Sequence, residues 1–167
     1  MQLLIVRHGI AAEQEDWAPR PDEERPLTER GELRMQEGAR GLRQLVPEVR
    51  AVLTSPLKRA VQTADIVAAA YDLSPRVVPE LAAGRDPHDI LSVLESMAGP
   101  DTVALVGHEP DLSTLVGLLL SGEARSLVSL GKGGACLLEL DERAEPGRAT
   151  LLWLLRPGQL RSLGTSH

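Results

Sequence analysis

The sequence predicts one α/β domain, a three-layer α/β/α sandwich with a mostly parallel central sheet and an antiparallel edge. Three observations predict this fold class. Short apolar runs alternate along the chain with longer segments whose apolar residues recur at helical spacing. The last two apolar runs, 135–140 and 149–155, are separated only by a turn, which favours an antiparallel pair. The length of 167 residues is that of one ordinary domain, which we place at 1–160, followed by a C-terminal tail at 161–167.

The first half of the chain predicts two strands, each followed by a helix. Thr28 is the expected N-cap of the first helix, and Ser55-Pro56 supplies an N-cap with proline at the first helical position of the second. The segment between the first strand and the first helix is polar and carries three prolines, so we expect a loop. The predicted elements are a strand at 2–6, a loop at 10–27, a helix over 29–46, a strand at 49–54 and a helix to about residue 71.

The second half continues the alternation. Asp86-Pro87 repeats the signal of an N-cap followed by proline, and the apolar residues after it recur at helical spacing. A buried strand then ends in Gly107-His108, and an apolar helix follows it. The predicted elements are a weak strand at 76–79, a helix from 87 to about 97, a strand at 102–106, a helix from 111 to about 120, and the strands at 135–140 and 149–155.

The composition excludes several classes of protein. The net charge is −6, whereas a general nucleic-acid binder needs a basic surface, so any anion site must be a local positive pocket. The single cysteine, Cys136, rules out an intrachain disulfide. No apolar run approaches the ~20 residues of a membrane helix, and no basic leader precedes the first strand, so we expect a cytoplasmic protein without membrane contact. No cluster of Asp, Glu or His suggests a metal, and we expect neither metal nor cofactor.

Three of the predicted strands end in residues of one chemical kind. The first ends in Arg7-His8-Gly9, the second leads to Arg59, and the fourth ends in His108. Because the carboxyl ends of parallel strands share one edge of a sheet, two imidazoles and two guanidiniums should converge there. Arg59 would also lie in the first turn of a helix, where backbone N–H groups favour an anion. The sequence therefore predicts a pocket for a phosphate-like group.

The ordered set of motifs resembles the histidine phosphatase superfamily, the phosphoglycerate-mutase-like branch with the Arg-His-Gly signature. Within it the chain looks most like the small phosphohistidine phosphatases of the SixA type, which have short connections and lack a long inserted lid. The motifs span most of the chain. In order, they are Leu4-Ile5-Val6-Arg7-His8-Gly9, Arg25-Pro26-Leu27-Thr28 with Gly31, the run from Thr54 to Ala64, Pro79-Glu80-Leu81, and Val106-Gly107-His108-Glu109-Pro110.

The resemblance implies a reaction in which His8 attacks phosphorus and becomes a transient phosphohistidine. Arg7, Arg59 and His108 would hold the three non-bridging oxygens, since phosphoryl transfer depends mostly on positioning and charge stabilisation. His8 must attack as a neutral imidazole, which the neighbouring guanidiniums favour, whereas His108 is more useful protonated. These opposite demands on two histidines predict a pH optimum.

Family position also makes Glu80 the candidate general acid, although the labile N–P bond of a phosphohistidine depends less on one. Gly9 and Ser55 join the expected phosphate-binding set, and Ser55 is expected either to orient His8 or to contact phosphate. Lys132 could add charge at the rim of the pocket. Cys136 lies in an apolar run and is expected to be inert core.

Three functions remain open on the sequence alone. The first is a metal-independent phosphatase of phosphohistidine in a protein partner. The second is a phosphatase of small phosphate esters. The third is a phosphate-binding module without catalysis, which the intact His8 argues against because binding alone needs no nucleophile. We expect a monomer that does not bind nucleic acid.

Overall fold

The computed structural model describes residues 1–97, 99 and 101–166. Its sheet has the strand order β3-β2-β4-β1-β5-β6. The strands are β1 (Gln2–Arg7), β2 (Ala51–Thr54), β3 (Arg76–Val77), β4 (Thr102–Gly107), β5 (Ala135–Leu140) and β6 (Ala149–Leu155). The helices are α1 (Gln14–Trp17), α2 (Glu29–Leu45), α3 (Lys58–Ala69), α4 (Pro87–Ser96), α5 (Asp111–Ser121) and α6 (Pro157–Thr165), with two short 3-10 turns, η1 (Asp22–Glu24) and η2 (Pro79–Leu81).

The register of the parallel strands brings their carboxyl ends to one edge. β4 lies between β1 and β2 and is parallel to both, with Arg7 level with Gly107 and Thr54 level with Val106. On the other side of β1, β5 runs antiparallel, and β6 runs antiparallel to β5. The predicted parallel sheet with an antiparallel edge is confirmed.

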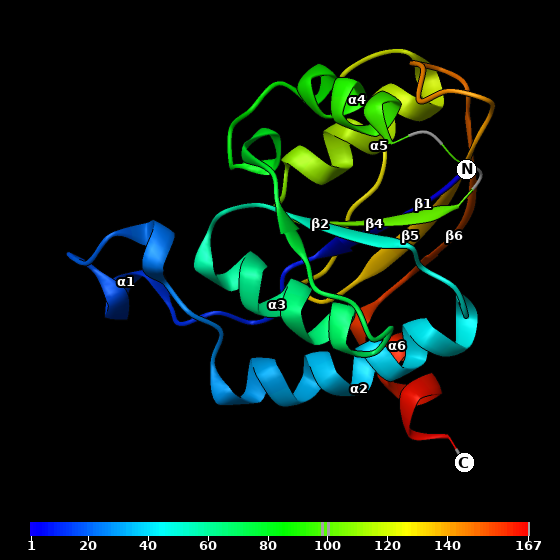
Figure 1. The fold of residues 1–167 in the computed structure, drawn as a ribbon. Helices are drawn as coiled ribbons and strands as arrows, with labels where there is room; N and C mark the ends of the chain where they lie inside the picture. Colours follow the sequence, from blue (N-terminus) through cyan, green and yellow to red (C-terminus); the bar gives the residue numbers. More distant parts are fainter. Residues whose placement is uncertain (98, 100, 167) are drawn as a thin grey trace.

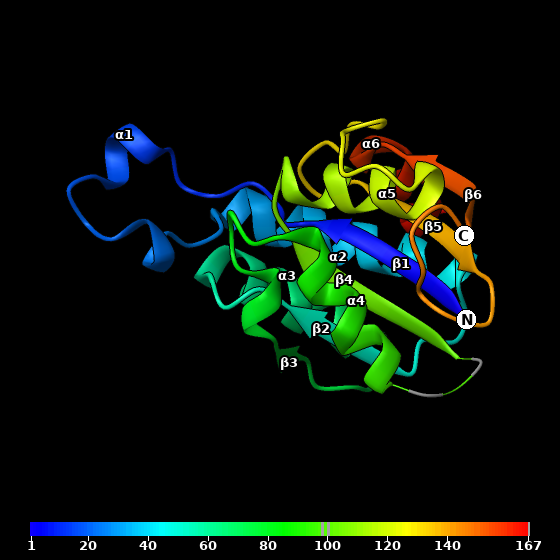
Figure 2. The same cartoon turned by 90° about the horizontal axis from the view of Figure 1, so that it is seen from above.

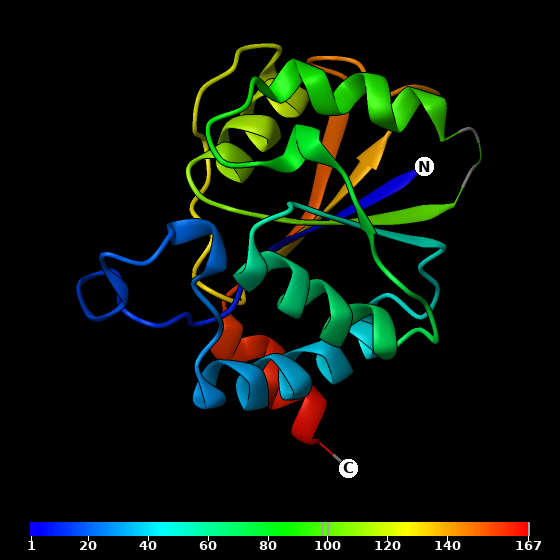
Figure 3. The same ribbon diagram turned by 60° about the vertical axis from the view of Figure 1, so that its left-hand side comes forward.

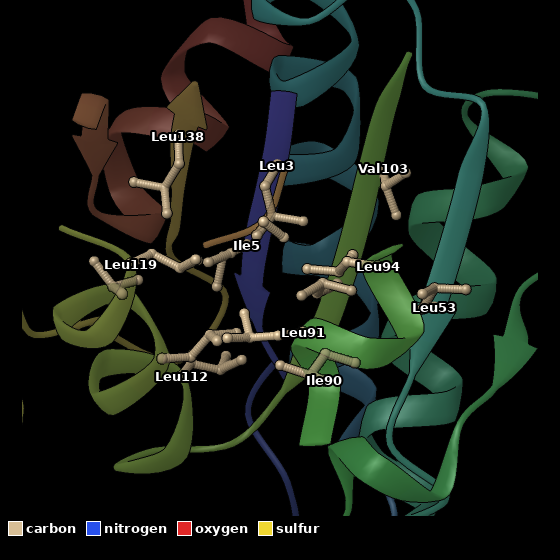
Figure 4. Packing of buried hydrophobic residues seen from close by; sticks show 14 of the residues in the cluster. Leu3, Ile5, Leu53, Ile90, Leu91, Leu94, Val103, Leu112, Leu119 and Leu138 are labelled. Atoms are coloured by element: carbon tan, nitrogen blue, oxygen red, sulfur yellow. The ribbon is translucent and has the colours of Figure 1, made fainter. Parts of the chain in front are cut away.

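Helices cover both faces of the sheet and make the three layers predicted from the sequence. Figures 1 and 3 show α2, α3 and α6 on one face and α4 and α5 on the other. Each face of the sheet has its own hydrophobic core, and alternate residues of β1 pack into one or the other. Leu3 and Ile5 pack toward α4 and α5 (Figure 4), whereas Leu4 and Val6 pack toward α2, α3 and α6. The core is largely aliphatic, as the low aromatic content requires. Across the described residues, no helix is both long and apolar enough to cross a membrane.

The structure differs from the sequence prediction in two segments. The expected loop at 10–27 contains α1 and η1, and it extends away from the sandwich (Figures 1 and 2). We call residues 12–26 the arm. The second difference is α6, which occupies residues 157–165, so most of the expected tail at 161–167 is helical. His167 lies outside the described residues.

Glycines allow α6 to approach α2 closely. A Cβ built on Gly41 would lie 2.0 Å from the carbonyl oxygen of Leu160, and one on Gly164 would lie 2.0 Å from that of Glu37. The side chain of Leu160 is fully buried between the helices and the sheet. The helices therefore meet backbone to backbone at this crossing.

Gly41→Ala is expected to destabilise the fold by about 1–3 kcal/mol, because the added methyl group forces α2 and α6 apart. Gly38→Ala is the matched control in the same helix, since a Cβ there meets nothing within 4 Å. Alanine has the higher helix propensity, so the control should gain about 0.5–1 kcal/mol. Urea unfolding midpoints measure both effects. Equal midpoints for the two variants would contradict the close crossing.

Candidate active site

The carboxyl edge of the parallel strands brings the predicted residues together. Arg7 ends β1 and His8 follows it, Arg59 lies in the first turn of α3 after β2, and His108 follows β4. The backbone N–H of His8 donates to the carbonyl oxygen of Gly107, which joins the ends of β1 and β4. The ring centroids of His8 and His108 are 5.3 Å apart. The expected convergence of the two imidazoles is therefore present.

His8 is held in a defined tautomer. Its ring is buried, and Nδ1 lies 2.7 Å from the carbonyl oxygen of Gly9. A carbonyl oxygen can only accept, so Nδ1 carries the proton and Nε2 keeps a free lone pair. Burial, and after it the positive charge of neighbouring groups, lower the pKa of His8 to about 3 against the opposing effect of the Gly9 hydrogen bond. His8 is therefore a neutral imidazole at pH 7, as a nucleophile must be.

Ser55 contacts His108, whereas one of the two sequence expectations was a contact with His8; the other, a contact with phosphate, stays a prediction. Its Oγ lies 2.6 Å from His108 Nε2 and accepts from the backbone N–H of Leu57 at 3.2 Å. Ser55 therefore orients His108 and does not orient His8. Burial, followed by the charge of Arg59, lowers the pKa of His108 to about 4, so this imidazole is also neutral at pH 7 in the free site. The expected protonation of His108 needs a bound anion nearby.

Three buried nitrogens in the site have no hydrogen-bond partner among the described residues. They are Arg7 Nε, Arg59 Nε and His108 Nδ1. A buried polar group without a partner costs about 1–3 kcal/mol, and functional sites are where such a cost is tolerated. The three nitrogens belong to the same three residues that the sequence assigns to the oxygens of a phosphoryl group. The site is therefore suited to an oxyanion.

The two guanidiniums are fixed by groups from other parts of the chain. Arg7 Nη1 donates to the carbonyl oxygen of Leu130 at 2.9 Å. Arg59 Nη1 donates to the carbonyl oxygen of Asp22 at 3.0 Å, and its Nη2 donates to the Asp22 carboxylate at 3.1 Å. Asp22 also pairs with Arg25, and these two arginines hold the pKa of its carboxyl group below the usual value against the effect of partial burial. The arm thus anchors one of the two guanidiniums.

Asp22 and Thr63 contact site residues, but the sequence motifs indicated no role for either of them. Thr63 Oγ1 donates to the carbonyl oxygen of Arg59 one turn earlier in α3 and accepts from the backbone N–H of Gly9, so it ties the His8 segment to α3. The four-residue spacing from Arg59 is a helical signal that could have found Thr63. Asp22 gave no such signal, because it lies 37 residues from Arg59 in a segment without apolar periodicity.

Of the remaining residues singled out from the sequence, two lie at the border of the site and one lies in the core. Glu80 is in η2, half-buried, and lines a small hollow together with His108 and Asp111. Lys132 is exposed on the turn before β5. Cys136 is buried in β5, where burial raises the pKa of its thiol to about 12. The structure therefore places Glu80 near the site, Lys132 at its periphery and Cys136 in the core.

The two histidines predict acid sensitivity of the fold. Their pKa values are lowered from about 6.5 to about 3 and about 4, so below pH 6.5 the unfolded chain binds protons that the folded chain does not. Stability should fall as the pH drops from 7 to 5, by up to about 4 kcal/mol for the pair. His108→Gln keeps a polar partner for Ser55 and should remove about half of this loss. Urea unfolding at pH 7, 6 and 5 measures it, and parallel pH curves for the two proteins would contradict it.

Fold and site together define an α/β protein with two imidazoles and two guanidiniums gathered at the carboxyl edge of its sheet. The profile of the histidine phosphatase superfamily (branch 1) matches residues 3–83. The phosphohistidine phosphatase SixA of Escherichia coli (strain K12) is 30% identical over 165 residues, which cover 96% of this chain and 97% of that protein. The chain belongs to the histidine phosphatase superfamily, branch 1, and is of the SixA type.

The chain is similar to two further proteins over most of its length. An uncharacterised protein of Picosynechococcus sp. (strain ATCC 27264 / PCC 7002 / PR-6) is 40% identical over 140 residues, 80% of this chain and 82% of that protein. The structure of the protein histidine phosphatase SixA complexed with tungstate matches with a TM-score of 0.82 and 31% identity, covering 96% of this chain and 99% of that one. The expected phosphoglycerate-mutase-like fold is thus confirmed, and the family membership supports phosphatase activity.

Proposed function

We propose that this protein is a metal-independent phosphatase that removes the phosphoryl group from phosphohistidine in a protein partner, with His8 as the nucleophile. The observation that carries the proposal is that two features occur in one site. His8 is neutral with a free Nε2 lone pair, and Arg7, Arg59 and His108 each have a buried nitrogen without a partner among the described residues. A nucleophile and a set of oxyanion donors are the two parts that phosphoryl transfer requires. The relative from Escherichia coli is a phosphohistidine phosphatase, and tungstate is a tetrahedral oxyanion like phosphate.

In the first step, His8 Nε2 attacks phosphorus in line with the leaving nitrogen. The Nε2–P bond forms as the bond between phosphorus and the substrate imidazole breaks, and the leaving nitrogen keeps the electron pair and takes a proton. Arg7, Arg59 and His108 stabilise the charge on the three equatorial oxygens. These side chains supply the positive charge that a divalent cation supplies in other phosphoryl-transfer sites.

In the second step, water attacks the phosphorus of phosphorylated His8, the P–Nε2 bond breaks, and phosphate leaves with His8 neutral again. Glu80 is the candidate for proton transfer in both steps, because it lines the same hollow as His108. A poor leaving group needs this proton more than an imidazole does. Glu80→Gln should therefore slow an alkyl phosphate more than a phosphohistidine.

The test compares three substrates in the presence of EDTA. One is a histidine-containing phosphotransfer domain phosphorylated on histidine, and the others are phosphoserine and glycerol 2-phosphate. We expect kcat/KM for the phosphoprotein to exceed that of the esters by at least about 100-fold, or about 2.7 kcal/mol of transition-state binding. Higher values for an ester would favour the phosphate-ester alternative. Tight phosphate binding without any turnover would favour a binding module, and loss of activity in EDTA would contradict metal independence.

A further inference from the structure

A second hollow lies beside the His8 segment, between α2, α6 and the turn 131–134. Its volume is about 270 Å³. Gly9 and Gly133 form the side nearest His8, whereas Arg7, Arg59 and His108 are not among the residues that line it. The hollow is therefore a neighbour of the phosphoryl site and does not share its oxyanion donors.

Three cations from three separate elements line this hollow. Arg34 comes from α2, Lys132 from the turn before β5 and Arg161 from α6. The pKa of Arg34 is lowered, mainly by loss of hydration and to a smaller extent by repulsion from Arg30 and Arg161. The positive charge of this cluster is therefore only partly neutralised. The opposing carboxylate is Glu37, whose oxygen lies 3.9 Å from Arg161 Nε. On a chain of net charge −6, this is a local concentration of positive charge.

A glycine without a packing role faces the same hollow. Gly31, Arg34, Met35 and Gly38 form one stripe of α2 along it. Position 31 has no room for a side chain, because a Cβ on Gly31 would lie 2.1 Å from a backbone oxygen. Gly38 is buried, yet a Cβ there meets nothing within 4 Å. A glycine inside a helix costs about 0.5–1 kcal/mol relative to alanine, and the effect of Gly38 on the structure is to keep the hollow open.

The rest of the wall is apolar. Ile10, Met35 and Pro157 contribute side chains, and glycine backbone covers much of the remainder. A cationic rim over an apolar wall suits a ligand with a negative head group and an apolar body, because both parts then lose water against a matching surface.

We propose that this hollow binds a small amphipathic anion, an acidic head group on an apolar body, at a site separate from the phosphoryl pocket. The anion would contact the backbone that supports the nucleophile, since the N–H of Gly133 donates to the carbonyl oxygens of Arg7 and His8. The inference does not depend on the proposed reaction.

The test uses three probes with one apolar body: 2-naphthoate, 2-naphthalenesulfonate and the neutral 2-naphthalenemethanol. Each is titrated into ¹⁵N-labelled protein twice, once without orthovanadate and once with excess orthovanadate to occupy the phosphoryl pocket. We expect the amides of Gly38 and Gly133 to shift, and the anions to bind at least about tenfold more tightly than the alcohol, a difference of about 1.4 kcal/mol. The ratio of carboxylate to sulfonate affinity distinguishes a planar from a tetrahedral head group.

Two variants separate the apolar wall from the cationic rim. Gly38→Leu fills the hollow and should weaken all three probes at least about tenfold. The double variant Arg34→Gln/Arg161→Gln should weaken only the two anions. Arg40→Gln removes an exposed cation of α2 outside the hollow and should change nothing. Equal affinity for the three probes, displacement of the probes by vanadate, or binding that survives both Gly38→Leu and the double variant would overturn the proposal.

Discussion

His8→Asn is expected to abolish turnover and phosphoenzyme formation, with a fall in kcat of about 10⁴-fold or more. The asparagine amide takes the place of the imidazole Nδ1 and can still donate to the carbonyl oxygen of Gly9. The variant therefore keeps the local hydrogen bond and loses only the nitrogen that would attack phosphorus. The measurement is transfer of ³²P from a labelled phosphoprotein to the enzyme, quenched in alkaline detergent because the N–P bond is labile to acid.

The matched control for this experiment is His88→Asn. His88 lies at the start of α4 with its side chain 57% exposed, and its Nδ1 lies 2.8 Å from the carboxylate of Asp86, the N-cap of the same helix. Both variants remove one histidine, but only His8→Asn removes one from the strand edge. His88→Asn should be labelled like the wild type. Retention of label on His8→Asn would show that another group, with His108 the nearest imidazole, accepts the phosphoryl group.

The part of the site that the sequence predicted is the part that lies at strand ends. Arg7 and His108 follow runs of buried aliphatic residues, so the places where those strands stop could be read directly, and parallel pairing brought them together. The position of Ser55 at a strand end did not show which histidine it would contact. A serine at the end of β2 satisfies the N–H of Leu57 whichever histidine it also contacts.

The helical turns of the arm and the helix α6 were not predicted from the sequence, and the physical reason is the same for both. The sequence signal of a helix is an apolar face, and α1 buries no residue while α6 buries only Leu160. The contact of α6 with α2 depends on the missing side chains of Gly41 and Gly164, which contribute nothing to apolar periodicity. Asp22 is anchored through charge to a residue distant in sequence, and spacing alone does not show such a pair.

Arg59→Met is expected to lower kcat/KM by about 10²- to 10³-fold, because it removes one of the donors that we propose stabilise the charge on the phosphoryl oxygens. The guanidinium is buried, and methionine fills a similar volume without leaving a charge. Arg59→Lys keeps the charge but loses the planar fork that Asp22 holds, so it should recover only part of the loss. Steady-state kinetics on the phosphoprotein substrate measures kcat/KM of each variant. Urea unfolding at the assay temperature must give each variant the same midpoint as the wild type, so that a loss of activity is not a loss of folded protein.

Asp22 tests whether the arm acts on the reaction through Arg59. Asp22→Asn leaves the backbone carbonyl bond to Arg59 Nη1 and weakens the carboxylate bonds to Arg59 Nη2 and Arg25 Nε, so we expect a smaller fall in kcat/KM of about 3- to 10-fold. The double variant Asp22→Asn/Arg59→Met should be no slower than Arg59→Met alone, because a positioning residue has no effect once the group it positions is gone. Additive losses in this double-mutant cycle would mean that Asp22 affects the reaction independently of Arg59, for example by contacting the phosphoprotein itself.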